Sequence, residues 1–156
     1  MACAMPPTIR PVRGAERGHL LALWERAVRA THHFLAAHEI TALGPLVAAE
    51  LASEQIDWWV LAEDRCEPIG FIGIAPGSIE ALFVDPVHHG RGVGTALVMH
   101  AQRLLRGSIR VDVNEQNAAA LRFYERLGFR TIDRSPVDSA GRPFPLVHML
   151  RRWPGA

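Results

Sequence analysis

The stretch of sequence that decides the fold is "LFVDPVHHGRGVGTAL", residues Leu82 to Leu97. It begins with apolar residues typical of a strand, is interrupted at Asp85-Pro86, and continues through three alternating glycines into residues with helical spacing. A helix that begins after a glycine loop offers unpaired N–H groups and the positive end of its dipole to an anion. The stretch therefore predicts a phosphate site, with a simple tight turn as the alternative interpretation.

Two familiar nucleotide-binding motifs do not fit this loop. A Walker A loop requires a lysine, and all 17 Lys and Arg residues of this chain are arginines. The dinucleotide motif GxGxxG fails because its third glycine position holds Thr95 when counted from Gly90 and Leu97 when counted from Gly92. The absence of lysine also excludes a Schiff base formed by a lysine of this chain.

Hydrophobic periodicity predicts strands and helices in mixed order on both sides of the loop. We expect strands at residues 8–13, 58–61, 69–74, 79–84, 109–113, 129–133 and 146–150. We expect helices at residues 16–30, 43–51, 95–105 and 118–127, the last capped by Asn117 and ended by Gly128. The strands at 58–61 and 69–74 suggest a hairpin whose turn is "EDRCEP". With no repeat or linker, residues 1–156 predict one α/β domain.

Composition narrows the class of partner. The chain has 156 residues and a formal net charge of +1, which gives no electrostatic case for binding nucleic acid. No apolar run approaches the roughly 18 residues of a membrane span, and no secretory signal is evident, so we expect no membrane association. Cys3 and Cys66 form neither a disulfide framework nor a metal-binding spacing, which favours a reducing, cytoplasmic setting.

A second block, "VNEQNAAALRFYERLGF", follows the glycine loop, and the two blocks together resemble the acetyl-CoA-binding core of the GNAT superfamily of N-acetyltransferases. The glycines of the family signature fall on Gly92 and Gly94, and His89 stands where most members have Arg or Gln. The second block matches at Asn117, Ala120, Phe123-Tyr124 and Gly128-Phe129. "ATHHFL" and "DSAGRPFPL" are also similar to a small bacterial subgroup, the YjaB-like proteins.

The resemblance implies a fold, a cosubstrate and a reaction. The fold is a mixed, mostly antiparallel sheet of six to seven strands, flanked by about four helices, with splayed central strands. The reaction moves an acetyl group from acetyl-CoA to a primary amine of a small molecule, peptide or protein, by a monomer or homodimer. A non-catalytic CoA-binding regulatory domain is the competing interpretation, and a purely structural protein a third. The implied cofactor-binding residues are Leu82, Phe83, Val84, His89, Gly90, Arg91, Gly92, Val93, Gly94, Thr95, Asn117 and Tyr124.

Acetyl transfer requires a deprotonated amine, stabilisation of the thioester oxygen and a proton donor for the departing thiolate. The resemblance places a general acid at Tyr124, whose phenol has an ordinary pKa near 10, and backbone donors around Phe83 and Val84. Asp112 and Glu80 are candidate general bases, and Asn114 a residue that orients water. The alternatives are a packed aromatic residue and solvent-facing strand carboxylates.

Eight histidines raise the question of a metal. No HExxH motif or His pair spaced i,i+4 is present, and adjacent helical residues such as His32 and His33 point about 100° apart, so we expect no metal. Trp24, His32, His33 and Phe34 are instead candidates for an acceptor pocket. The alternative is an exposed helix end, with the tryptophan in the core.

Overall fold

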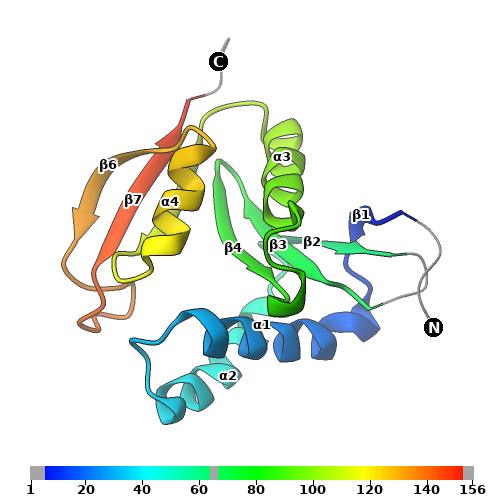
Figure 1. Ribbon diagram of the computed structural model, residues 1–156, viewed down its shortest axis with the longest axis horizontal. Helices are drawn as coiled ribbons and strands as arrows, with labels where there is room; N and C mark the ends of the chain where they lie inside the picture. The colour runs from blue at the N-terminus through cyan, green and yellow to red at the C-terminus, as the bar shows by residue number, and fades with distance from the viewer. Residues whose placement is uncertain (1–5, 64–66, 153–156) are drawn as a thin grey trace.

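The computed structural model describes residues 6–63 and 67–152. Their strands form one seven-stranded sheet in the order β1-β2-β3-β4-β5-β7-β6 (Figure 1). The strands are β1 (Thr8–Pro11), β2 (Asp57–Ala62), β3 (Gly70–Ala75), β4 (Ser78–Val84), β5 (Ile109–Asn114), β6 (Arg130–Ser135) and β7 (Leu146–Arg151). The helices are α1 (Arg17–Thr31), α2 (Ala37–Leu51), α3 (Val93–Leu105) and α4 (Ala118–Arg126), with short 3-10 helices at Gly14–Glu16 and Pro86–His88.

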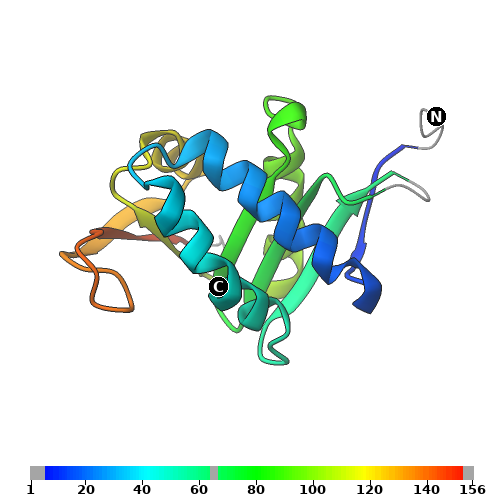
Figure 2. The same ribbon diagram turned by 90° about the horizontal axis from the view of Figure 1, so that it is seen from below.

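Each face of the sheet carries its own hydrophobic core. Buried residues of α3, such as Leu97 and Val98, pack with β5 and β7 on one face. Buried residues of α1 and α2, such as Leu23 and Ile40, pack over β2 and β3 on the other, and Figure 2 shows these two helices lying across the sheet. Alternate side chains of the strands therefore pack against helices on opposite faces of the sheet.

The centre of the sheet opens because of an irregularity in β4. Every neighbouring pair of strands is antiparallel except β4 and β5, which are parallel and pair only at Ser78 with Arg110 and Ile79 with Val111. Between β3 and β4 the register shifts by one residue, so that Glu80 is an extra residue on β4. Such a bulge bends its strand. Beyond Glu80, β4 therefore parts from β5, and β6 and β7 fan away from β4 in Figure 1.

The predicted elements are all found, with one boundary clearly wrong. The helix expected at 43–51 begins at Ala37, six residues earlier, and includes Pro45. The reason is packing, since the buried Ile40 holds the first turns of α2 in the core beneath α1. The turn expected at 63–68 includes residues 64–66, which lie outside the described residues. Cys3 also lies outside them. No helix among the described residues is long and apolar enough to span a membrane.

Candidate active site

A cavity of about 630 Å³ lies where β4 and β5 part. Its wall is formed by β4, the glycine loop, the start of α3, the end of β5 and α4, and the end of α1 adds Thr31 and His32. The splayed strands, the loop and the aromatic helix α4 therefore enclose one space.

The glycine loop owes its shape to two left-handed residues. Gly90 has φ = 75° and Gly92 has φ = 79°, a region that side chains with a Cβ rarely adopt. A Cβ at either position would meet nothing within 4 Å, so the space beside the loop is open. Gly94 serves packing instead, because a Cβ there would come within 3.2 Å of the Phe123 ring. The loop thus presents bare backbone at the N-terminus of α3, a geometry suited to a phosphate group.

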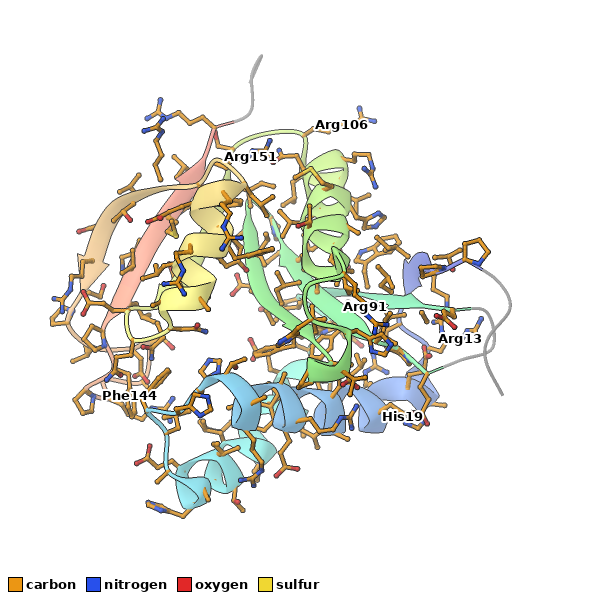
Figure 3. The ribbon with its side chains drawn as sticks, viewed as in Figure 1. Arg13, His19, Arg91, Arg106, Phe144 and Arg151 are labelled. Atoms are coloured by element: carbon orange, nitrogen blue, oxygen red, sulfur yellow. The ribbon has the colours of Figure 1, made fainter. Side chains whose placement is uncertain are left out.

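Side chains on both sides hold this loop in place. Arg26 of α1 donates to Asp85 at 2.8 Å, and the Val87 N–H donates to the same carboxylate at 3.2 Å. Although burial alone would raise it, these donors hold the pKa of the Asp85 carboxyl below its usual range. The His89 ring Nε2 lies 3.1 Å from the Val84 carbonyl oxygen, so this nitrogen carries the hydrogen and donates. His89 is thereby tied to the end of β4, and Arg91 is exposed (Figure 3).

The gap between the strands receives backbone donors from alternate residues of β4. The Asp85 N–H donates to the Ile69 carbonyl at 2.8 Å, on the β3 side. Because N–H groups along a strand alternate in direction, Phe83 also directs its N–H toward β3, whereas Leu82 and Val84 direct theirs into the gap. Of the two donors expected around Phe83 and Val84, the geometry therefore offers Val84, together with Leu82.

Tyr124 lies on the cavity wall and is otherwise enclosed. Its exposed fraction is 6%, and its ring makes edge contacts with Phe123 at 5.0 Å and Phe129 at 5.2 Å between centroids. Burial raises the pKa of the Tyr124 phenol well above its usual range. The phenol is therefore protonated at neutral pH and can donate a hydrogen bond.

The candidate carboxylates stand between two cavities. Glu80 and Asp112 line both the main cavity and a second one of about 530 Å³ beside the start of β4 and β5. Glu80 accepts from the Ser78 hydroxyl at 2.7 Å, and Asp112 lies 2.6 Å from Nδ1 of His148. Asn114 also lines the main cavity, where its side-chain oxygen accepts from the Gln116 N–H at 2.9 Å.

Only one of the four predicted acceptor-pocket residues, His32, lies on the cavity wall. Burial and the neighbouring His33 lower the pKa of the His32 imidazole, so this ring is neutral at neutral pH. His33 is exposed. Phe34, in the connection between α1 and α2, packs against Phe144 with tilted rings whose centroids lie 6.2 Å apart; Phe144 is labelled in Figure 3. The prediction that Trp24 lines the acceptor pocket is wrong, because Trp24 faces the sheet from α1 and is buried in the core.

Two further predictions concern Asn117 and a metal ion. Asn117 lines the cavity, but its side-chain oxygen caps α4 by accepting from the Ala120 N–H at 3.1 Å. Among the described residues, no three His, Cys, Asp or Glu side chains gather closely enough to hold a metal ion. Sequence reasoning missed His148 and Ser135, which the sheet brings to Asp112 from β7 and β6.

Splayed central strands, an open glycine loop and a helix dipole directed at one cavity define a protein built to bind an acyl-CoA and transfer its acyl group. The chain belongs to the acetyltransferase (GNAT) family, whose model matches residues 20–129. It is 40% identical to the peptidyl-lysine N-acetyltransferase YjaB of Salmonella typhimurium, over 91% of this chain and 96% of that protein. It is also 32% identical to the peptidyl-lysine N-acetyltransferase YiaC of Escherichia coli, over 91% of this chain and 99% of that protein.

Solved structures of other proteins share this fold. The solution structure of apo YjaB from Escherichia coli superposes with a TM-score of 0.85 at 38% identity, covering 97% of this chain and all of that one. The fold is shared with PaiA N-acetyltransferase of Thermoplasma acidophilum, solved in complex with coenzyme A, with a TM-score of 0.78 at 18% identity over 96% of this chain and all of that one. The predicted fold class, family and N-acetyltransferase activity are confirmed, and the YjaB-like proteins are indeed relatives.

Proposed function

We propose that this N-acetyltransferase uses acetyl-CoA to acetylate the side-chain amine of lysine in a peptide or protein. The observation that carries the proposal is the position of Glu80 and Asp112 on the wall shared by the two cavities. Two carboxylates at that point would attract a cationic ammonium group as it approaches the thioester. The activity named for YjaB and YiaC supports the same acceptor.

The donor side of the cavity fits coenzyme A. Gly90, Gly92 and the N-terminus of α3 would hold the pyrophosphate by backbone N–H groups, in the space that a Cβ would enter. Leu82 and Val84 direct N–H groups toward the pantetheine arm and the thioester oxygen. Bound acetyl-CoA supplies an activated acetyl group and a thiolate leaving group. No contact proposed here requires the exposed side chain of Arg91.

Tyr124 would stabilise the departing thiolate as a hydrogen-bond donor. An ordinary thiol has a pKa of about 8.5, below that of a phenol, and burial raises the pKa of Tyr124 further. Tyr124 therefore holds its proton at neutral pH and donates a hydrogen bond more readily than it gives the proton away. This role requires the hydroxyl group alone.

Asp112 would receive the proton of the acceptor. As the bond from nitrogen to the acetyl carbon forms and the carbon–sulfur bond breaks, the nitrogen becomes acidic enough to protonate a carboxylate. The side chain of Asp112 is 53% exposed, so it is open to the solvent-filled cavities. Glu80 would act with it as a second negative charge, held by Ser78. Asn114 remains a candidate for orienting water, and His32 for contacting the acceptor.

The sharpest test compares acceptors by mass spectrometry. The chain contains no lysine, so acetyl-lysine detected in the assay comes from the acceptor and not from the enzyme. We expect turnover of peptides that have a blocked N-terminus and one lysine, and none when that lysine is replaced by arginine. Turnover of small amines with no acetylation of any lysine peptide would overturn the proposed acceptor, and failure of acetyl-CoA to bind would overturn the proposed cosubstrate.

The remaining parts of the proposal concern the whole chain. We propose that residues 1–156 act as a single N-acetyltransferase domain, as a monomer or homodimer, without a metal ion. A cytoplasmic location belongs to the proposal because it rests on the cysteine content alone. Size-exclusion chromatography with light scattering measures the oligomeric state.

A further inference from the structure

We propose that Ser135, His148 and Asp112 form a hydrogen-bonded chain that positions the Asp112 carboxylate to act as the base. This inference rests on the proposed function, in which Asp112 receives the acceptor proton. Asp112 is the residue that would touch the acceptor, and His148 and Ser135 are positioning residues behind it.

Three strands bring these residues together on one face of the sheet. His148 of β7 is directly opposite Asp112 of β5 in the register, and its Nδ1 lies 2.6 Å from the Asp112 Oδ1. The Oγ of Ser135, on β6, lies 2.6 Å from Nε2 of the same imidazole. The His148 side chain is 17% exposed, against 53% for Asp112. The imidazole is therefore sheltered, while the carboxylate it contacts faces the cavities.

The chemistry of the three groups fixes their hydrogens. A carboxylate can only accept, so His148 must carry a hydrogen on Nδ1 and donate it to Asp112 Oδ1. In the neutral ring Nε2 is then an acceptor, and the Ser135 hydroxyl donates to it. With Oδ1 occupied, the other oxygen of Asp112, Oδ2, is the one available to the acceptor. The chain thus selects one oxygen and one orientation of the carboxylate.

The hydrogen-bonded chain fits either charge state of the imidazole. When Nε2 gains a proton it donates to Ser135 Oγ, whose hydroxyl turns its hydrogen away. The neighbouring strands place further charged groups on this face: Asp133 opposite His148 and Arg130 opposite Leu150 on β6, and Arg110 two residues before Asp112 on β5.

Four variants test the chain, with kcat and KM as measurements. His148→Ala removes both hydrogen bonds and should lower kcat by about 10- to 100-fold with little change in the KM for acetyl-CoA. His148→Asn keeps an amide donor at the distance of Nδ1 from Cα, so it should retain more kcat at neutral pH than the alanine variant. Ser135→Ala should lower kcat by about 3- to 10-fold.

The fourth variant, Asp133→Asn, is the matched control. It removes a carboxylate from the other side of His148, where Asp133 accepts from the Arg134 N–H at 2.8 Å, and leaves the Asp112 contact intact. It should keep wild-type kcat. If His148→Ala keeps the wild-type kcat while Asp112→Asn loses activity, the positioning role is wrong and the proposed base stands. If Asp112→Asn is itself fully active, the base assignment fails and the inference fails with it.

A spectroscopic measurement tests the chain without any acceptor. Long-range ¹H–¹⁵N NMR of the free enzyme should show His148 with its hydrogen on Nδ1, identified by the signal that His148→Asn removes. The Asp112→Asn variant has no carboxylate that requires a hydrogen on Nδ1, so the tautomer with its hydrogen on Nε2 should appear. A wild-type ring with its hydrogen on Nε2 would overturn the inference, even if no lysine peptide proves to be a substrate.

Discussion

The two sides of the active site are built in different ways. The proposed donor side is one continuous stretch, Leu82 to Leu97, and would bind acetyl-CoA through backbone N–H groups that glycine and a helix end expose. The proposed acceptor side is built from side chains of four strands, namely those of Glu80, Asp112, Ser135 and His148. A backbone site depends on local conformation, whereas a side-chain site depends on the register of the sheet.

This difference predicts how each side responds to mutation. On the donor side most side chains are replaceable, and damage requires a change that fills the open space or alters the backbone. On the acceptor side a single functional group should matter while the fold and the binding of acetyl-CoA remain intact. The variants below test that contrast, beginning with the largest expected effect.

Gly92→Asp should have the largest effect. It places a carboxylate in the open space beside the N-terminus of α3, where the pyrophosphate is proposed to lie, and strains a residue with φ = 79°. Repulsion between close charges is worth several kcal/mol, so the affinity for acetyl-CoA should fall about 100-fold or more. Isothermal titration calorimetry measures the loss.

Gly141→Asp is the matched control for this variant. Gly141 has φ = 77° and open space around its Cβ position, but it lies in the loop between β6 and β7. The two variants therefore add the same charge at equal backbone strain. Equal affinity for acetyl-CoA in both would show that the glycine loop is not the phosphate site.

Tyr124→Phe should reduce kcat by about 100-fold and leave the KM for acetyl-CoA nearly unchanged. The hydrogen bond from the phenol strengthens only as negative charge develops on sulfur, and phenylalanine preserves the edge contacts with Phe123 and Phe129. A free-thiol assay measures the rate. Should Tyr124→Phe turn over at the wild-type rate with chemistry rate-limiting, Tyr124 is only a packed aromatic residue.

The same contrast explains what could be predicted from the sequence. The loop, α3, and α4 with its Asn117 cap follow from glycine positions, helical spacing and a polar cap residue within a few neighbours. The bulge at Glu80 and the early start of α2 at Ala37 depend on packing between elements. A local sequence pattern does not carry that information. Trp24 is a different case, since it falls in the buried stripe of α1 at helical spacing with Leu20 and Ala27, and that pattern already favours the core.

The acceptor side lay beyond sequence reasoning for a geometric reason. His148 and Asp112 are 36 positions apart, and β7 lies between β5 and β6 although it follows both in the chain. Their contact exists only once this strand order and its register are known. The one available signal was an alternating strand with a polar residue, His148, on the solvent side of Val147 and Met149.

A third prediction measures the scaffold that both sides share. The Arg10 guanidinium, which donates two bonds of 2.8 Å, lowers the pKa of the Glu16 carboxyl to about 2, although partial burial opposes it. A depressed pKa means that the stabilisation is present above the ordinary value of 4.5 and is lost as pH falls toward 2. Glu16→Gln should lower the free energy of unfolding by about 1 to 2 kcal/mol at pH 7.

Urea unfolding at pH 7 and pH 3 measures this effect. The difference between Glu16→Gln and wild type should narrow at the lower pH, because at pH 3 the Glu16 carboxyl is protonated in the unfolded chain but stays mostly ionised in the folded one. The affinity for acetyl-CoA should not change, since neither Arg10 nor Glu16 lines the main cavity. A change in affinity as large as that of Gly92→Asp would mean that the donor side responds to stability in general and not to its own loop.

The smallest effect is expected at His89, where this chain departs from the family signature. Its ring donates to the Val84 carbonyl, so it organises the loop from the side and does not face a phosphate. His89→Ala removes one exposed hydrogen bond and should weaken acetyl-CoA binding by about 2- to 5-fold. His89→Arg restores a cation that can pair with phosphate and should tighten binding by a similar factor in low salt. Calorimetry at two salt concentrations measures both. A loss of 100-fold with alanine would contradict a backbone-only donor side, because the imidazole itself would then be a principal phosphate ligand.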